Sequence, residues 1–424
     1  MKKLVIVLLL LSLCFPTTAN AFGGKTYRSE GYSYRLASKK AEITGYYGEG
    51  GEIIIPSHLD GYPVVSIGDN AFYSCKSLTA VNIPDGVKHI RSAAFYDCVN
   101  LASITIPKSV TSIGWFVFAY CKSLTTITVP HGVESIGVSV FRECENLTSV
   151  TIPKSVKSIG ECAFSGCSSL TDLIIPNSVK SIGYSAFSGC SSLTGLTIPD
   201  SVKSIEEFAF KDCSSLVSIT LPTGLKSIEK STYWGCISLT SIIIPKGAKS
   251  IGDTAFVHCF NLASVTISEG LKSIGEYAFI NCEGLTSITI PESVTSIGAG
   301  AFSGCRNLPS INIPQRIKSI ENMVFFGCQK LASISIPKGV KSIGEDAFYH
   351  CDGLVTISIP EGVSTIGDRA FVDCWRLNSV TIPKSVTYIG SDAFTKCPKL
   401  VLQVVNDSYA YKYAVENGLT HTTK

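Results

Sequence analysis

Apolar and polar residues follow a pattern along most of this chain that returns every 23 residues. In one such unit, Leu285–Ile290 alternates apolar and polar residues, which predicts a short strand with one buried face. Pro291 ends this strand, because proline lacks the N–H that a continuing ladder requires. Residues 296–298 predict a second short extended piece, and Phe302 lies in a predicted helical or 3₁₀ turn that inserts it into the core.

Single residue types keep step with this period. Cysteine recurs every 23 residues from Cys75 to Cys397, without an insertion across fifteen units. Leu stands three residues after each of these cysteines and Ile eight residues before, and Phe stands three before in all units but one, where Tyr233 replaces it. A fixed period of this length predicts one supersecondary unit per repeat, stacked on its neighbours. The fold class is therefore a repeat solenoid of about fifteen coils.

Units such as residues 296–314, with Cys305, Leu308 and the run Ile311 to Pro314, resemble BspA-type leucine-rich repeats. The resemblance covers roughly residues 64–405. It implies a parallel β-sheet with short turns or 3₁₀ segments on the other side, and no enzymatic activity. Such repeats occur in secreted and surface proteins of host-associated bacteria and some protozoa, and several members are associated with adhesion.

The ends of the chain depart from the repeat. Residues 1–21 combine Lys2 and Lys3, an apolar run and a small-residue cleavage site, which predicts a secretory signal peptide. Residues 22–63 are predicted as an N-terminal cap, 64–405 as the leucine-rich repeats, and 406–424 as a C-terminal capping helix. Ser408 is its predicted N-cap and Gly418 its stop. A membrane anchor would need a longer apolar run.

Composition and motifs favour binding over catalysis. The formal net charge of +3 gives no reason to expect nucleic acid as a partner. The six histidines mostly occupy different repeat positions, and phosphate loops, nucleophile–base pairs and metal motifs are missing. We therefore expect no enzyme, no cofactor and no metal site.

The periodic cysteines predict a ladder of thiols rather than a disulfide framework. Disulfide scaffolds pair cysteines from different structural positions, whereas these fifteen share one position in successive coils. Free Cys behaves as a small buried hydrophobe. We expect reduced, inward-facing thiols that meet backbone groups, with Cys162 outside the ladder.

Glycine is frequent directly after the periodic Ile, as at Gly114 and Gly137. This predicts either a positive φ or a close approach of two backbones. Positive φ is not obligatory there, because other coils carry Arg or Glu at the same position. These exceptions are Arg91, Glu206, Glu229 and Glu321.

Two columns of residues outside the core are candidate binding surfaces. The first is a lysine ridge, two residues before the periodic Ile, which favours a polyanion or glycan. Acids four residues later, at positions 161, 207, 253, 276 and 345, predict pairing within each coil that would neutralise much of it. The ridge consists of Lys157, Lys180, Lys203, Lys226, Lys249 and Lys272.

The second column lies on the outer face of the predicted main sheet and is rich in hydroxyl groups. Thr also suits a strand for purely structural reasons. Trp234 adds an aromatic side chain of the kind that anchors interfaces, in the coil that departs most from the repeat, where either a kink or a site would explain the change. The candidate threonines are Thr105, Thr128, Thr151, Thr197, Thr220, Thr266 and Thr289.

These features predict an exported or cell-surface protein that binds an extracellular protein or a cell-surface ligand, such as host matrix or other cells. Two alternatives remain open at this point. One is a structural component that associates with copies of itself, and the other is capture of a polyanion or glycan by the lysine ridge.

Overall fold

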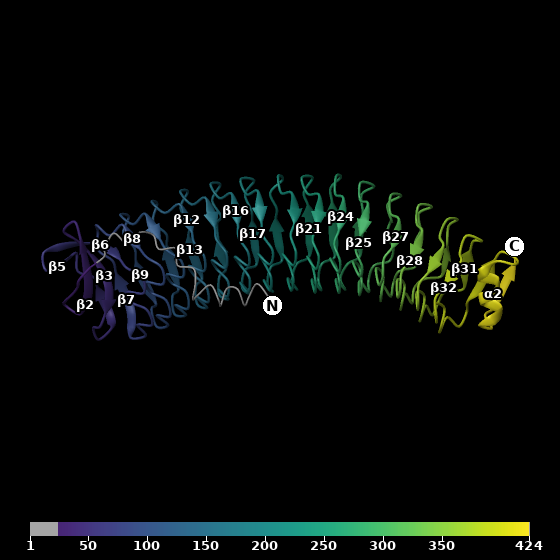
Figure 1. Cartoon of the computed structure of the whole chain (residues 1–424), viewed down its shortest axis with the longest axis horizontal. Coiled ribbons are helices and arrows are strands. Elements are labelled where there is room, and N and C mark those ends of the chain that lie inside the picture. The colour runs from purple at the N-terminus through teal and green to yellow at the C-terminus, as the bar shows by residue number, and fades with distance from the viewer. Residues whose placement is uncertain (1–23, 424) are drawn as a thin grey trace.

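The computed structural model describes residues 24–423, which form a long, gently curved solenoid (Figure 1). Successive coils stack from the N-terminal strands at one end to helix α2 (Tyr409–Glu416) at the other. The predicted signal peptide, residues 1–21, lies outside the described residues, as do residues 22 and 23 of the predicted N-terminal cap.

One strand per coil builds a long-strand ladder along the molecule. Neighbouring strands are parallel and in register, so that Thr128 faces Thr151 and Thr266 faces Thr289. The ladder is interrupted in places, and in the coils near residues 310 and 333 it is reduced to a single bridge. Its strands are β4 (Gly51–Ile54), β7 (Leu78–Asn82), β9 (Ser103–Thr105), β11 (Thr126–Thr128), β13 (Ser149–Thr151), β15 (Asp172–Leu173), β17 (Gly195–Thr197), β19 (Ser218–Thr220), β21 (Ser241–Ile244), β23 (Ser264–Ile267), β25 (Ser287–Thr289), β29 (Thr356–Ser358), β31 (Ser379–Ile382) and β33 (Val401–Val404).

A second, short-strand ladder confirms the extended piece predicted before the glycine column. Its parallel strands are two residues long and mostly carry the sequence Ser-Ile. They are β8 (His89–Ile90), β10 (Ser112–Ile113), β12 (Ser135–Ile136), β14 (Ser158–Ile159), β16 (Ser181–Ile182), β18 (Ser204–Ile205), β20 (Ser227–Ile228), β22 (Ser250–Ile251), β24 (Ser273–Ile274), β26 (Ser296–Ile297), β27 (Ser319–Ile320), β28 (Ser342–Ile343), β30 (Thr365–Ile366) and β32 (Tyr388–Ile389).

The two ends continue the stacking beyond the fifteen cysteine-bearing coils, to about 17 turns. At the N-terminal end, β1 (Thr26–Ser29), β2 (Tyr32–Ala37) and β3 (Lys40–Tyr46) are antiparallel, and β3 then pairs in parallel with β6 (Tyr62–Ile67). The short strand β5 (His58–Leu59) pairs antiparallel with β6. At the other end, β34 (His421–Thr423) pairs with β33, and the Ser408 hydroxyl caps α2, as predicted, by accepting from the Tyr411 N–H.

The core is a column of aromatic rings, one from each coil. The periodic Phe side chains are buried, and neighbouring rings stack with centroids 4.8–6.1 Å apart. Phe279 lies between Phe256 and Phe302, at 5.1 and 5.5 Å, which confirms its assignment to the core. Each coil therefore buries its ring only against the two adjacent coils, as expected for a repeat protein.

The turns that carry these rings use hydrogen bonds between residues three apart, as at Cys305 N–H to Phe302 O. They do not continue into helices, because two residues of each turn take a positive φ, for example Tyr277 at 54° and Asn281 at 58°. The glycine column has no such requirement. A Cβ on Gly183 would lie 2.8 Å from the Glu161 nitrogen, so close approach explains this glycine.

Candidate binding surfaces

The outer face of the long-strand ladder presents the predicted threonine column to solvent. In β11, buried Ile127 stands between exposed Thr126 and Thr128, because side chains of a strand alternate between its two faces. All seven candidate threonines are exposed. Parallel in-register pairing then places their equivalents side by side across coils, so we call this surface the hydroxyl face.

Two isoleucines interrupt the hydroxyl face and were not among the predicted site residues. Ile174 is 84% exposed and Ile243 is 65% exposed, although both occupy positions of the threonine column. They are three coils apart, a distance of about 14 Å at the usual strand spacing. The sequence signal was present, because an apolar residue at an outward-facing strand position breaks the alternation.

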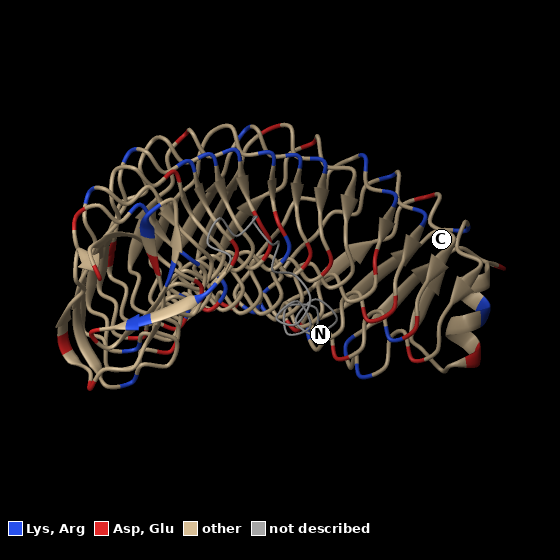
Figure 2. Ribbon diagram, turned by 60° about the vertical axis from the view of Figure 1, so that its left-hand side comes forward, with Lys and Arg blue, Asp and Glu red and all other residues tan. Residues whose placement is uncertain are grey.

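The lysine ridge is exposed throughout and runs along one edge of the solenoid, where basic residues recur coil after coil (Figure 2). Its backbone belongs to the short-strand ladder, with the Lys180 N–H donating to Lys157 O at 2.7 Å and the Lys249 N–H to Lys226 O at 2.7 Å. The backbone that carries the lysine side chains is thus held at regular intervals.

The structure shows a different pairing of this ridge from the one that the sequence predicted. Lys157 pairs with Glu134 of the preceding coil, with Nζ and Oε2 2.9 Å apart. Glu345 pairs instead with Arg369, and the Asp253 carboxylate accepts from the backbone N–H of Glu276 at 2.9 Å. In these three cases the side chain takes its partner from an adjacent coil rather than from its own.

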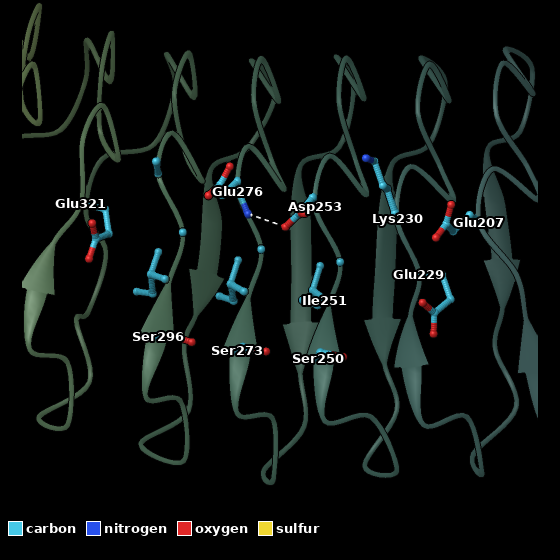
Figure 3. A pocket seen from close by; sticks show the side chains of 16 residues that line it. Glu207, Glu229, Lys230, Ser250, Ile251, Asp253, Ser273, Glu276, Ser296 and Glu321 are labelled. Atoms are coloured by element: carbon cyan, nitrogen blue, oxygen red, sulfur yellow. Dashed lines mark hydrogen bonds between the residues drawn. The ribbon is translucent and has the colours of Figure 1, made fainter. Parts of the chain in front are cut away.

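Beside the ridge lies an acidic trough with a volume of ≈ 620 Å³ (Figure 3). Its floor is formed by three successive Ser-Ile-Gly segments that begin at Ser250, Ser273 and Ser296. Lys230 is the basic residue among those that line it. The carboxylates are Glu207, Glu229, Asp253, Glu276 and Glu321.

The ends of the trough coincide with breaks in the short-strand ladder. The ladder stops between β18 and β20 and again between β26 and β27. At these places Glu229 and Glu321 stand in the glycine column, and each carboxylate accepts a hydrogen bond from the serine two residues earlier. Glu206 also stands in the glycine column, but its carboxylate accepts from the Tyr184 N–H. Its backbone N–H still donates to the Ile182 carbonyl of the preceding coil.

Trp234 is half-buried in a mixed aromatic cluster on the turn side. Lys211 Nζ lies 5.8 Å from its ring centroid, and His258 packs edge-on at 6.3 Å. His258 in turn contacts exposed Phe260 at 5.3 Å. Trp234 is therefore held by its neighbours, and only part of this predicted anchor is available to a partner.

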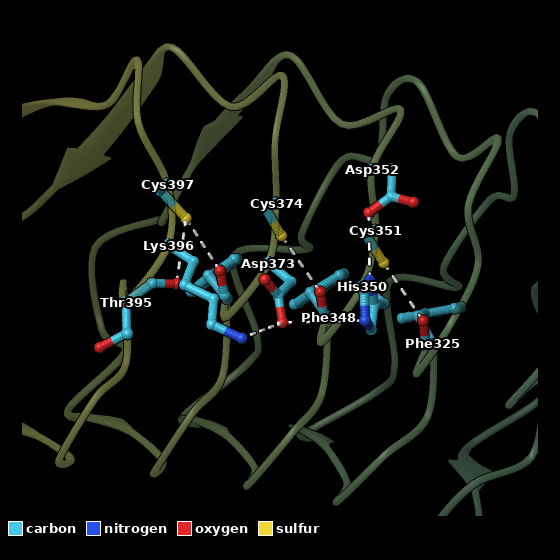
Figure 4. A network of polar contacts seen from close by, with 11 residues as sticks. Phe325, Phe348, His350, Cys351, Asp352, Asp373, Cys374, Thr395, Lys396 and Cys397 are labelled. Carbon is cyan, nitrogen blue, oxygen red and sulfur yellow. Dashed lines mark hydrogen bonds and ion pairs between the residues drawn. The ribbon is translucent and has the colours of Figure 1, made fainter.

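The cysteine ladder lies inside, as predicted. From Cys98 to Cys374 the thirteen periodic cysteines are buried and free, whereas Cys75, Cys162 and Cys397 are partly exposed. Each ladder thiol from Cys98 onward donates to the carbonyl of the core aromatic residue 26 positions earlier, which is Phe in every case except Tyr233, at 3.0–3.3 Å (Figure 4). These bonds join successive coils and satisfy buried carbonyls.

Burial makes these thiols poor nucleophiles. It raises the pKa of Cys98 to about 12, and the fully buried members are also shifted upward for the same reason. Burial also raises the pKa of Cys162 to about 11, so this cysteine, although outside the ladder, is not an activated thiol.

One polar cluster lies near the C-terminal coils. Buried Asp373 contacts Lys396 at 3.3 Å and His350 at 3.7 Å, and His350 also contacts Asp352 at 3.3 Å (Figure 4). Within residues 24–423, no set of His, Cys, Asp and Glu side chains is arranged to hold a metal ion.

The repeats, ladders and inward thiols define a leucine-rich-repeat solenoid. The model of the BspA type leucine rich repeat region (6 copies) matches residues 51–171, 159–286 and 272–401. The chain belongs to this family of repeat-protein scaffolds, which are generally non-catalytic.

The chain is also similar to solved structures. A leucine-rich repeat protein from Bacteroides ovatus is 29% identical, with a TM-score of 0.65, and the match covers 94% of this chain and 99% of that one. A leucine rich cell surface protein from Faecalibacterium prausnitzii is 30% identical, with a TM-score of 0.48, over 93% of this chain and 98% of that one. Curated proteins gave no match.

Proposed function

We propose that this chain is an exported protein that recognises another protein at a cell surface through the hydroxyl face. Family membership supports a protein-interaction role. The surface location is supported by the Faecalibacterium relative, which is described as a cell surface protein, and by the leader-like residues 1–21. In the described part of the chain, no helix is long and apolar enough to cross a membrane.

The observation that carries this proposal is the exposure of Ile174 and Ile243 among threonines. Complete burial of one such side chain in a partner would contribute about 1.5–3 kcal/mol. The surrounding hydroxyls supply hydrogen-bond donors and acceptors on a surface that the solenoid already holds in place. Interfaces concentrate their binding energy in a few residues surrounded by nearly neutral contacts, and we assign that role here to the two isoleucines.

The test replaces each isoleucine by the residue that neighbouring coils carry, as Ile174→Thr with Ile243→Thr. The double variant should fold normally and bind at least tenfold more weakly to whichever protein or cell type captures the mature chain in a panel of host matrix proteins and cells. Ile54→Thr is the matched control, because Ile54 is 73% exposed at the N-terminal end of the same face. Unchanged binding by the double variant would contradict the proposal.

The exposed lysine ridge favours polyanion binding as a second candidate. Lys180, Lys226 and Lys249 are exposed and regularly spaced. Replacing these three by Gln should lower the salt concentration that elutes the protein from immobilised heparin. A heparin column that fails to retain the native protein at 50 mM salt would exclude this candidate.

A further inference from the structure

The lysine ridge and the acidic trough are two borders of one strip of surface. In the coil around Ile251, Lys249 precedes the short strand β22 and Asp253 follows it, and in the next coil Lys272 and Glu276 stand in the same relation. Figure 3 shows the carboxylates of Asp253 and Glu276 on one side of the serine row. The strip therefore has a positive border and a negative border that run in parallel along the solenoid.

Such a strip is complementary to itself in one orientation. A two-fold rotation about an axis parallel to the solenoid, placed between two facing copies, exchanges the left and right borders. Lys249 and Lys272 of each copy then face Asp253 and Glu276 of the other, whereas Lys226 faces Lys230, so the attraction is centred on these two coils. Rotation about an in-plane axis perpendicular to the solenoid would instead bring lysine against lysine, which is repulsive.

We infer that this strip is a self-association surface, whose partner is a second, parallel copy of the same chain. Because the solenoid is curved (Figure 1), the contact is confined to the few coils around the trough.

The predicted contact depends on charge, which sets its strength and its salt dependence. Exposed ion pairs are individually weak, so several coils must act together and the dimer forms only at high protein concentration. Screening over about 3 Å in 1 M salt, compared with about 10 Å in 0.1 M salt, should abolish it. This behaviour differs from that of an apolar interface, which high salt does not dissolve.

Charge exchange between the two borders tests both the surface and its orientation. Variant one carries Lys249→Glu and Lys272→Glu, so both of its borders are acidic in these two coils. Variant two carries Asp253→Lys and Glu276→Lys, so both borders are basic. In sedimentation at about 100 μM protein and 50 mM salt, the native chain should dimerise and each variant alone should be monomeric. An equimolar mixture of the two variants should recover a heterodimer.

A charge-matched control carries Lys108→Glu and Lys384→Glu, two exposed lysines far from the strip, and should dimerise like the native chain. A native chain that is monomeric under these conditions would overturn the inference. It would also be overturned if the native chain dimerised while the mixed variants stayed apart, because a different surface or orientation would then be responsible. Neither result bears on the hydroxyl face, which lies on the other ladder.

Discussion

Two stretches of the short-strand ladder differ in whether their coils are joined by hydrogen bonds. From Ser135 to Ile205, strands β12, β14, β16 and β18 form one sheet, and Gly183 donates to Ile159 O of the preceding coil at 2.9 Å. The second stretch is the junction between β18 and β20, next to Glu229, where this sheet ends and the two strands are not paired. The core continues regardless, since Tyr233 stacks on Phe210 at 5.7 Å. The interior of the molecule is therefore insensitive to an interruption that changes its surface.

This comparison indicates that the buried columns set stability while the outer columns set local shape. Changes in the core should thus have equal effects on either side of the interruption, whereas changes in the glycine column should not. A third break in the short-strand ladder, between β10 and β12, supports the role of bulky outer side chains. It lies next to Trp115, whose ring is 3.0 Å from the position of a Cβ on Gly137.

The largest effect should come from alkaline pH, which acts on all coils alike. Burial raises the pKa of the fully buried ladder thiols above their ordinary value of 9.0, so they stay neutral in the folded protein while an unfolded chain ionises. Partly exposed Cys397 is the exception, because its hydrogen bond with Cys374 lowers its pKa. The stabilisation is complete below about pH 8, begins to be lost as the pH passes 9, and continues to fall until the pH reaches the raised pKa values of the folded thiols. At pH 10 each thiol costs about 1.4 kcal/mol, or roughly 18 kcal/mol for the thirteen buried ones.

Urea unfolding under reducing conditions at pH 7, 8, 9 and 10 measures this loss. We expect the midpoint to fall steeply above pH 9, with both stretches unfolding together. A midpoint at pH 10 equal to that at pH 7 would show that the thiols are not buried as described.

Next in size is Phe279→Ala, which removes a ring stacked on both sides and should cost about 3–5 kcal/mol. Phe187→Ala, in the uninterrupted stretch, should cost a similar amount, because its ring is also fully buried between two neighbours. Hydrogen exchange should show the damage concentrated within the adjacent coils. Phe394→Ala, beside α2, should fray only the end of the solenoid.

Tyr233→Phe should stabilise the protein by about 1 kcal/mol. The Tyr233 hydroxyl is buried and has no hydrogen-bond partner in the described structure, and an unsatisfied polar group is costly. The change restores the residue of every other coil. A lower thermal midpoint for this variant would mean that the hydroxyl has a partner, such as a buried water molecule.

The smallest effect separates the two stretches most directly. Glu229→Gly should let residue 229 donate to Ile205 O, close the ladder and slow exchange at this amide, with a change in stability below about 1 kcal/mol. The reciprocal change Gly183→Glu should destabilise, because its Cβ would approach the preceding backbone. If the amide of residue 229 exchanged at the same rate in the native protein and in the Glu229→Gly variant, Glu229 would not be the cause of the interruption.

The sequence was sufficient for the solenoid because its signals are local and repeated. The period, the Phe core and the inward thiols each follow from one residue type at one position, and fifteen copies remove ambiguity. The gap at Glu229 was not predictable, because Arg91 and Glu206 occupy the same column and keep their backbone bonds. Whether the short-strand ladder continues or is interrupted depends on the direction in which the Glu carboxylate at this position points.

The candidate surfaces were predictable in position but not in pairing. Alternation in the strands placed the threonine column outside correctly, and its two isoleucines could have been recognised from the same pattern. The partner of a long exposed side chain depends on the stacking of coils. Lys157 therefore pairs with Glu134 of the preceding coil rather than with an acid of its own.

The bonds from the ladder thiols to the core aromatic carbonyls span 26 residues, the bonds to the periodic Ile carbonyls span 24, and the backbone bonds between ridge lysines span 23. A whole coil can therefore be added or removed without altering the kind of contact that any remaining residue makes. Length is then a quantity that can change in steps of about 4.8 Å while the architecture stays constant. The length of the solenoid, and with it the distance over which it can reach a partner, is therefore determined by the number of copies of one unit.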